Sequence, residues 1–338
     1  MKKREIIAAV LTAAVILTMC EALSWVLIPK RLDYGATWGY YLEEERDTID
    51  VMFYGSSLAY CDVVPSVIYD ETGITSYVMG GPEQTIPMTY YYIKETFRTQ
   101  SPDVIFVEAT GLLYPEYTDY TKVNIGYMPR GINRFLATFT YAEKEEKTGL
   151  IFPLYNYHSR WNEIGLSDIK MAFNRYGSPD MLAGYTYLDI YGENIEKAER
   201  DFGIDEENYR RNVEYMKKIA DYAEEKRAKT VFYIAPCRLV MSQQDKEMVR
   251  KDMESIENAI FMDFNDVYDS IGIDETRDWY DNLHFNSKGA KNFSRFIADY
   301  ITENNLAQPN EKADAELWNK RTEHFEELSA NELKPHGK

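Results

Sequence analysis

The chain has 338 residues, 45% of them hydrophobic, so it is long enough to bury one substantial core. Its formal net charge of −18 argues against a nucleic-acid partner, because a phosphate backbone is held by clustered Lys and Arg side chains. The three cysteines, Cys20, Cys61 and Cys237, have no CxxC spacing and no histidine cluster beside them. We therefore expect no metal and no other cofactor. We expect Cys61 and Cys237 to be reduced thiols, with a disulfide between them as the alternative.

The N-terminal segment, residues 1–30, is typical of a membrane anchor. It starts with three basic residues and continues as an apolar stretch from Ile6 to Ile28, with a charge only at Glu21. This length can cross a hydrocarbon core of ~30 Å, and the basic start keeps the N-terminus cytoplasmic. A cleaved signal peptide is the alternative, but no small-x-small site follows the apolar stretch. We expect a retained single-pass helix in the cell membrane, with the rest of the chain extracytoplasmic.

After a polar connector, residues 31–48, short apolar runs alternate with helical patterns. The expected strands are DVMFYG ending near Gly55, TSYVMG ending at Gly80, PDVIFVEA ending near Glu108, KTVFYIAP ending at Pro236, and AIFMDF ending at Phe264. The expected helices are Gln84–Arg98, Asp205–Lys226, Ser242–Ile256 and Lys288–Ile301. This alternation predicts an α/β fold, a three-layer α/β/α sandwich around a five-stranded parallel sheet.

We place one domain at residues 49–303, with a large insertion at residues 110–202, where no period is sustained. The insertion leaves from the end of the third strand. Ligands of open α/β sheets bind outside the carboxyl ends of the strands, so we expect the insertion to cover a site. Residues 304–338 form a polar C-terminal tail, with a short helix expected from Leu317 to Leu328 and a frayed end.

The segment FYGSSL places a glycine and two serines directly after the first expected strand. Gly55 permits a sharp turn there. A serine in that turn has its hydroxyl exposed and its backbone NH in the same crevice, as a nucleophile requires. The alternative is a plain strand-to-helix turn in which a serine caps the helix.

The segment DWYDNLHFNSKGAKNF places Asp281 three residues before His284, just ahead of the last expected helix. An aspartate at this spacing can bond one imidazole nitrogen and fix the tautomer, while the other nitrogen faces a serine across the sheet. Ser287 is the expected N-cap of the helix. The other histidines, His158, His324 and His336, lack this setting.

These two segments resemble the SGNH/GDSL hydrolase superfamily, whose nucleophile lies in a Gly-Asp-Ser-Leu-like turn and whose Asp-x-x-His lies near the C-terminus. GSSL matches with Ser57 as the nucleophile and Ser56 in place of the family's aspartate. That replacement is similar to the membrane-anchored branch of the teichoic acid D-alanine transfer protein and the alginate O-acetylation proteins. The resemblance covers residues 48–108 and 230–300.

The resemblance also implies an oxyanion hole formed by the backbone NH groups of Ser57 and Gly80, with Gly81 as the alternative. In the family the third strand usually ends in an asparagine that donates a further hydrogen bond. Here Glu108 stands at that place. Because an ionised glutamate cannot donate, Glu108 orients another group, stays protonated, or leaves the third donor absent.

Further candidates for substrate binding lie in the insertion and at the strand ends. The segment YNYHSRWNEIG groups His158, Arg160 and Trp161, which together suit a saccharide through stacking and hydrogen bonds. Gln84 and Glu108 are expected near the crevice. The alternative for the insertion segment is a packed aromatic anchor with a solvated arginine.

We therefore expect a serine-dependent acyltransferase or esterase that acts on acyl groups, foremost acetyl, of a cell-surface polysaccharide. In this hypothesis Ser57 attacks, His284 is the general base and Asp281 orients it. The resemblance implies a membrane-bound O-acyltransferase as partner if the reaction is a transfer. One rival is a non-catalytic glycan-binding surface protein with the same fold. A weaker rival is a thiol enzyme that uses Cys61 or Cys237.

Overall fold

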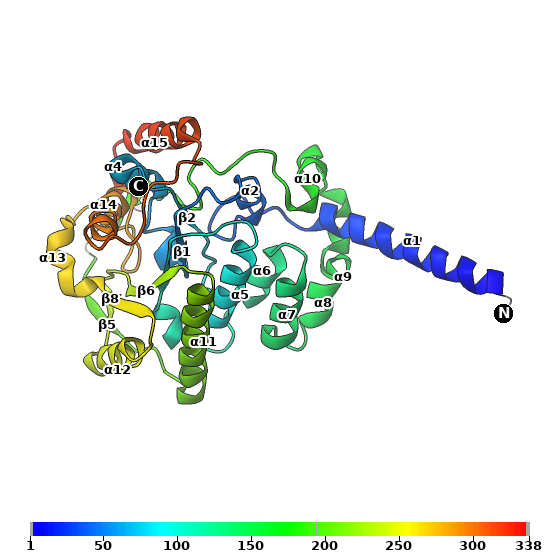
Figure 1. The fold of residues 1–338 in the computed structure, drawn as a ribbon, viewed down its shortest axis with the longest axis horizontal. Helices are drawn as coiled ribbons and strands as arrows, with labels where there is room; N and C mark the ends of the chain where they lie inside the picture. The colour runs from blue at the N-terminus through cyan, green and yellow to red at the C-terminus, as the bar shows by residue number, and fades with distance from the viewer. Residues whose placement is uncertain (1–2, 194, 336–338) are drawn as a thin grey trace.

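Five short apolar strands pair in parallel to form the central sheet (Figure 1). The computed structural model describes residues 3–193 and 195–335. The strands are β1 (Val51–Tyr54), β2 (Ser76–Val78), β3 (Val104–Glu108), β6 (Lys229–Ile234) and β8 (Ala259–Asp263). Their order is β2-β1-β3-β6-β8, which confirms the expected strands and is the flavodoxin-like order of doubly wound sheets. The order reverses between β1 and β3, so the crevice where such sheets bind ligands lies beside the end of β1.

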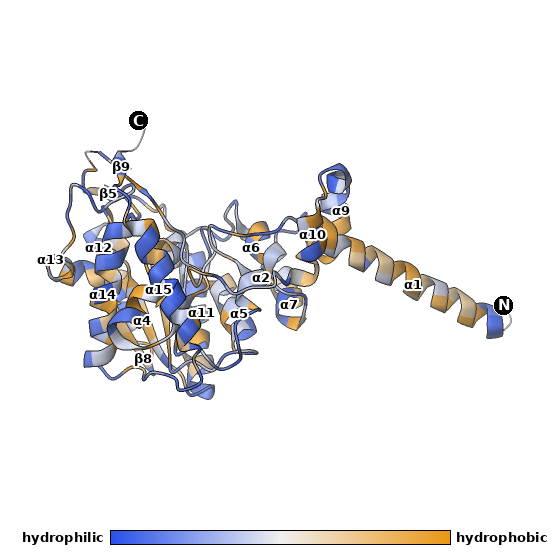
Figure 2. Cartoon of the chain, turned by 90° about the horizontal axis from the view of Figure 1, so that it is seen from above, coloured by the Kyte–Doolittle hydropathy of each residue, from blue (hydrophilic) through white to orange (hydrophobic). Residues whose placement is uncertain are grey.

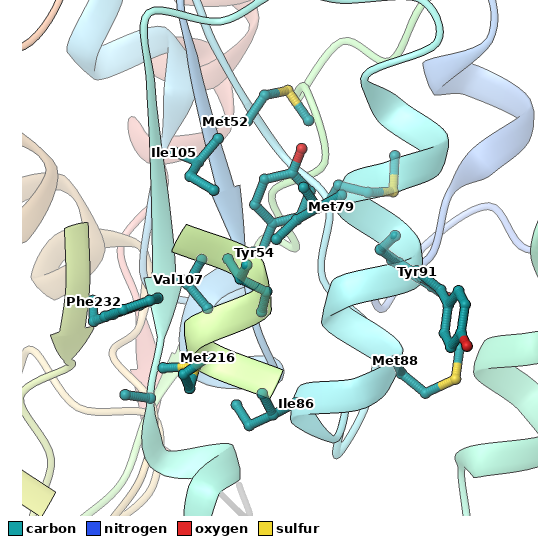
Figure 3. Close-up of a cluster of buried hydrophobic side chains, with 14 of the residues drawn as sticks. Met52, Tyr54, Met79, Ile86, Met88, Tyr91, Ile105, Val107, Met216 and Phe232 are labelled. Carbon is teal, nitrogen blue, oxygen red and sulfur yellow. The ribbon is translucent and has the colours of Figure 1, made fainter. Parts of the chain in front are cut away.

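Helices cover both faces of the sheet because alternate residues of each buried strand point to opposite sides. On one face, Met52, Tyr54 and Ile105 pack against α5 (Ile86–Thr96), α11 (Glu206–Glu225) and α12 (Gln243–Glu254), as Figure 3 shows for α5 and α11. On the other face, Phe53 and Phe106 pack against α4 (Pro65–Thr72) and α14 (Ser287–Glu303). The predicted three-layer α/β/α sandwich is confirmed.

The four helices expected from periodicity are present as α5, α11, α12 and α14, with ends within a few residues of the prediction. The helix α4 was not expected. It starts with a proline at its first position and ends at Gly73, which adopts a left-handed conformation with φ of +73°. These are ordinary start and stop signals, but the helix has only eight residues and so too little length for a clear period.

The insertion consists mostly of short helices. It contains η1 (Thr110–Leu113), α6 (Thr121–Tyr127), α7 (Ile132–Tyr141), α8 (Lys147–Ile151), α9 (Pro153–Tyr157), η2 (His158–Asn162), α10 (Leu166–Lys170), η3 (Ala172–Asn174), β4 (Ile190–Tyr191) and β5 (Ala198–Arg200). Its ends stay near the sheet, where β5 pairs with β7 (Leu239–Met241). Its middle packs elsewhere, with α7 against α5 and α9 against α1 (Lys3–Leu27) (Figure 1).

The segments expected as connector and tail pack onto the domain. The connector contains α2 (Trp38–Tyr41), and the tail contains α15 (Ala315–Ser329), which packs against α4, and β9 (Lys334–Pro335), which pairs with β4. Arg321 of α15 is fully buried and forms an ion pair with the buried Glu44. The remaining short elements are α3 (Ser57–Tyr60), η4 (Phe264–Val267) and α13 (Tyr268–Ile271). α1 is long and apolar enough to cross a membrane, which makes it a candidate anchor or signal sequence.

Candidate active site

Ser57 lies at the first helical position after β1, at the carboxyl edge of the sheet. The turn needs Gly55, because its φ is +149° and a Cβ there would lie 2.6 Å from the Cβ of Glu108. Ser56 is the N-cap of α3, and its side chain accepts a hydrogen bond from the NH of Leu58. The serine that caps the helix is therefore Ser56. The hydroxyl of Ser57 is not used for capping and is available for another partner.

The structure brings Ser57, His284 and Asp281 into one hydrogen-bonded chain. The Oγ of Ser57 lies 2.7 Å from Nε2 of His284. The Nδ1 of His284 lies 3.0 Å from each carboxylate oxygen of Asp281. The hydroxyl, the imidazole and the carboxylate are thus within hydrogen-bonding distance of one another, in the order that serine acyl-transfer chemistry requires.

The protonation of this chain follows from Asp281. Partial burial raises the pKa of Asp281, but hydrogen bonds from the His284 ring and from the backbone NH groups of Leu283 and His284 outweigh it, and the net pKa lies below its ordinary value. An ionised carboxylate only accepts hydrogen bonds, so Nδ1 of His284 carries a proton. Nε2 is then the acceptor for the Ser57 hydroxyl, which is the tautomer that a general base requires.

The loop that carries His284 is held at several points. The NH of Tyr280 donates to the His284 carbonyl at 2.9 Å, which closes the turn that presents the ring. The NH of Phe285 donates to a carboxylate oxygen of Asp62, at 3.0 Å, which ties the loop to the segment after α3. Such contacts fix the ring before any substrate arrives, and preorganisation of this kind lowers the cost of reaching the transition state.

The N-cap of α14 is Asn286, not Ser287 as expected. The Asn286 side chain accepts from the NH groups of Lys288 and Gly289, and Ser287 is the first helical residue. Asparagine and serine are equally good caps, so a sequence with both in succession does not decide between them. Gly289 allows close packing, because a Cβ there would lie 2.3 Å from the Asp278 carbonyl oxygen.

Ser57 and Gly80, the two residues expected to supply an oxyanion hole, lie on neighbouring turns. Ser57 is the first residue of its helix, so its NH has no acceptor within the helix. Gly80 follows β2, and a Cβ there would lie 2.7 Å from the Gly55 carbonyl oxygen, which shows how closely the two turns approach. The NH of Gly81 donates to that same carbonyl at 3.1 Å. Of the two glycines, Gly80 is therefore the one that is available as a donor.

Glu108 ends β3 and is buried beneath the Gly55 turn. One of its carboxylate oxygens accepts from the NH and the hydroxyl of Thr110, at 2.9 and 2.5 Å. Burial raises its pKa to about 7, against the opposing effect of the Thr110 hydrogen bonds. Glu108 thus holds the start of η1, and its raised pKa keeps it protonated below about pH 7, so its position agrees with the first two of the three roles that the sequence left open.

Gln84 is also buried at the edge of the sheet, and its amide donates to the Thr89 hydroxyl at 2.9 Å. The amide oxygen of Gln84 lies 3.0 Å from the position that a Cβ on Gly81 would occupy. Gln84 therefore lies beneath the glycine turn that presents Gly80. In this position its side chain packs against the turn.

The group His158, Arg160 and Trp161 lies beside α1, apart from Ser57 and His284 (Figure 1). Arg160 donates to the Leu27 carbonyl and forms ion pairs with two nearby carboxylates. The Trp161 side chain is exposed. The three residues are close to one another as their spacing suggests, but the path of the insertion, which sequence periodicity did not predict, takes them to the helix α1.

Two site residues escaped the sequence reasoning. Asp62 tethers the His284 loop, and the Tyr114 hydroxyl donates to the Ser56 side chain at 3.3 Å. Asp62 lies shortly after the serine turn, in an otherwise apolar stretch. A single aspartate in such a stretch is a signal that could have identified it as a site residue. Tyr114 is one of 28 tyrosines, so nothing in the sequence singles it out.

A cavity of about 200 Å³ lies nearby, lined by residues next to Ser57 and His284 and not by Ser57, His284 or Asp281 themselves. Its lining includes Leu58 and Leu283, the sequence neighbours of Ser57 and His284, together with Thr110, Lys197 and Arg200. The guanidinium of Arg200 lies over the Phe202 ring, 4.6 Å from its centre. The lining therefore combines apolar side chains with the cationic Lys197 and Arg200 and with the carboxylate of Asp263.

The three cysteines are free thiols in this structure, so Cys61 and Cys237 form no disulfide. Burial raises the pKa of Cys61 well above its ordinary value and that of Cys237 to about 12. Both ring nitrogens of His284 are engaged by Asp281 and Ser57. A thiolate activated by this histidine is thus not what the geometry favours.

No protein-family model matches the chain, and no curated protein matches it. Among solved structures, a similar chain comes from Bacteroides fragilis and is provisionally described as an acylhydrolase. The two sequences are 12% identical, the alignment covers 78% of this chain and 93% of the other, and the TM-score is 0.40.

Proposed function

We propose that this protein is a serine-dependent acyl-transfer enzyme of the SGNH type, an O-acyltransferase or esterase. The observation that carries the proposal is the bonded chain from the Ser57 hydroxyl through His284 to Asp281. A structural turn would not require an imidazole with a fixed tautomer at bonding distance from a serine. Such an arrangement lowers the barrier for attack by a hydroxyl that is otherwise a weak nucleophile.

In the proposed reaction the Ser57 Oγ attacks the acyl carbonyl carbon while Nε2 of His284 takes the hydroxyl proton. The carbonyl oxygen becomes an oxyanion that accepts from the NH groups of Ser57 and Gly80. Collapse breaks the bond to the leaving alkoxide, which takes the proton from the imidazolium. The acyl-serine is then attacked by water, which releases an acid, or by a sugar hydroxyl, which forms a new ester.

The substrate class is part of the same proposal. The cavity beside Leu58 and Leu283 has room for a small acyl group such as acetyl. Its cationic side, Lys197 and Arg200, suits a polar or anionic glycan. With α1 as an anchor, the domain would act on a cell-surface polysaccharide outside the cytoplasmic membrane, beside a membrane-bound O-acyltransferase if the reaction is a transfer.

The test is turnover of p-nitrophenyl acetate by the full chain in detergent. We expect His284→Ala and Asp281→Asn to lower kcat by at least about 1,000-fold and 100-fold, because they remove the base and its tautomer control. His324→Ala, a histidine in α15, serves as the matched control and should leave kcat unchanged. With a saccharide added as acceptor, an acetylated sugar among the products would identify transfer. Wild-type turnover by His284→Ala would refute the mechanism.

A further inference from the structure

The middle of the insertion exposes a set of large apolar side chains. We call them the collar, and they are Phe135, Phe139, Phe152, Tyr155, Trp161 and Leu166. Each is between 47% and 77% exposed. They come from α7, α9, η2 and α10 and from the residue before α9, and these elements gather at the end of the body from which α1 emerges (Figures 1 and 2). Large exposed apolar side chains that gather at one end of a body mark a contact with another apolar phase.

The end of α1 is built into the same part of the molecule. Glu21 forms an ion pair with Arg130, whose guanidinium also lies 5.2 Å from the centre of the Trp25 ring. Leu27 is buried, and its carbonyl accepts a hydrogen bond from Arg160. The last turns of α1 thus form one packed unit with the insertion, so the position of the helix fixes the position of the collar.

The exposed apolar part of α1 covers most of a bilayer core. Residues 6–20 are uncharged and exposed, and at ~1.5 Å per residue they extend roughly 22 Å of the ~30 Å of a hydrocarbon layer. If these residues span the membrane, its outer boundary lies near Glu21. That is the level at which α9 lies beside α1.

A groove of about 740 Å³ separates α1 from α9 at this level. Leu17 and Cys20 line one side of it, and Ile151, Phe152 and Tyr155 line the other. The lining is mostly apolar and opens outward next to the exposed apolar part of α1. A hydrocarbon chain fits this lining, because contact between apolar side chains and water is unfavourable.

From these observations we propose that the collar is a second membrane contact, embedded in the outer interfacial layer of the lipid bilayer around α1. The proposal rests on α1 spanning the membrane and not on the acyl-transfer chemistry. Tryptophan and tyrosine favour the interfacial layer, and short helices with an apolar face bind in its plane. Two contacts hold the domain at a fixed height and orientation, whereas one helix alone would leave it free to rotate.

The test places a fluorophore on the collar in the full chain. Cys20 and Cys237 are replaced by serine, Trp161→Cys is introduced, and the new thiol is labelled with an environment-sensitive dye in nanodiscs of phosphatidylcholine and phosphatidylglycerol. Lys320→Cys on the exposed face of α15 is the matched control. Leu166→Cys provides a second collar position in case the first variant does not fold.

We expect the dye at Trp161→Cys and Leu166→Cys to emit at shorter wavelength and to be quenched by spin-labelled lipid, while the dye at Lys320→Cys shows neither effect. Quenching by a spin label attached to lipid requires contact with lipid, so it identifies lipid as the occupant. Emission equal to that of the control would overturn the proposal and assign the collar to a protein partner instead.

Discussion

At the scale of single residues, the site depends on side chains whose neighbours determine their protonation and direction. Ser57 and His284 lie 227 positions apart in the sequence, and the hydrogen bond between them is accompanied by a carboxylate that selects the tautomer. Asp281 stays ionised because it accepts from two backbone NH groups as well as from the ring. The same physical reasoning gives predictions for Glu108 and Gly80.

Replacement of Glu108 by glutamine should change how stability depends on pH. The pKa of Glu108 rises from its ordinary 4.5 to about 7 on folding, so between these values the folded state binds the proton that the unfolded state releases. The free energy of unfolding of the wild type should therefore fall as pH rises from 4.5 to 7, by roughly 3 kcal/mol in total from this group.

Glu108→Gln should remove this decline, because its amide oxygen still accepts from Thr110 and it does not titrate. The measurement is thermal or denaturant unfolding of both proteins in detergent at a series of pH values. Relative to the wild type, the free energy of unfolding of the variant should be higher above pH 7 than near pH 4.5, where the two proteins should match. Parallel curves for the two proteins would show that Glu108 is ionised throughout, contrary to the pKa inferred from its burial.

Substitution of Gly80 by alanine should impair activity more than stability. The added Cβ would lie 2.7 Å from the Gly55 carbonyl oxygen, so the two turns must separate and the NH of residue 80 is displaced. We expect kcat/KM for p-nitrophenyl acetate to fall roughly 100-fold, as for the loss of one oxyanion donor. Gly126→Ala in α6 is the control, since its Cβ has only an ordinary contact at 3.8 Å with Leu150. Equal rates for the two variants would exclude Gly80 from the hole.

At the scale of elements, the sheet was predictable and its surroundings were only partly so. Buried parallel strands are apolar throughout, and runs such as the one that ends at Gly55 stand out beside polar loops. The motifs at Ser57 and His284 could be placed because each directly adjoins a recognisable strand or helix. α4 is too short to show a period, and the choice of Asn286 over Ser287 as cap depends on loop geometry that the sequence does not specify.

The packing of α15 gives a prediction at this scale. Arg321 and Glu44 form a buried ion pair that joins the C-terminal helix to the segment after α1. Arg321→Ala leaves an unpaired buried carboxylate and should cost about 3–5 kcal/mol of unfolding free energy. Lys320→Ala breaks the exposed pair with Glu316 in the same helix and should cost less than about 1 kcal/mol. Denaturant unfolding of the two variants compares them, and similar losses would show that α15 adds little to the stability of the domain.

At the scale of the whole molecule, the insertion divides its roles. Its ends contribute Thr110, Tyr114 and Arg200 to the site, while its middle packs against α1 and exposes the collar. The sequence predicted an insertion over the site but not this division, because the course of short helices is set by tertiary contacts such as the one between Arg160 and Leu27. The collar and three residues near Ser57 thus belong to one continuous segment.

The most direct test of the central claim is whether Ser57 is a nucleophile activated by His284. The full chain is treated with a fluorophosphonate, and the modified peptide is identified by mass spectrometry. The account predicts a covalent adduct on Ser57 that is absent in Ser57→Ala, strongly reduced in His284→Ala and unchanged in His324→Ala. A folded wild-type protein that forms no adduct at Ser57, or an adduct that forms equally fast without His284, would contradict it and favour a glycan-binding protein with this fold.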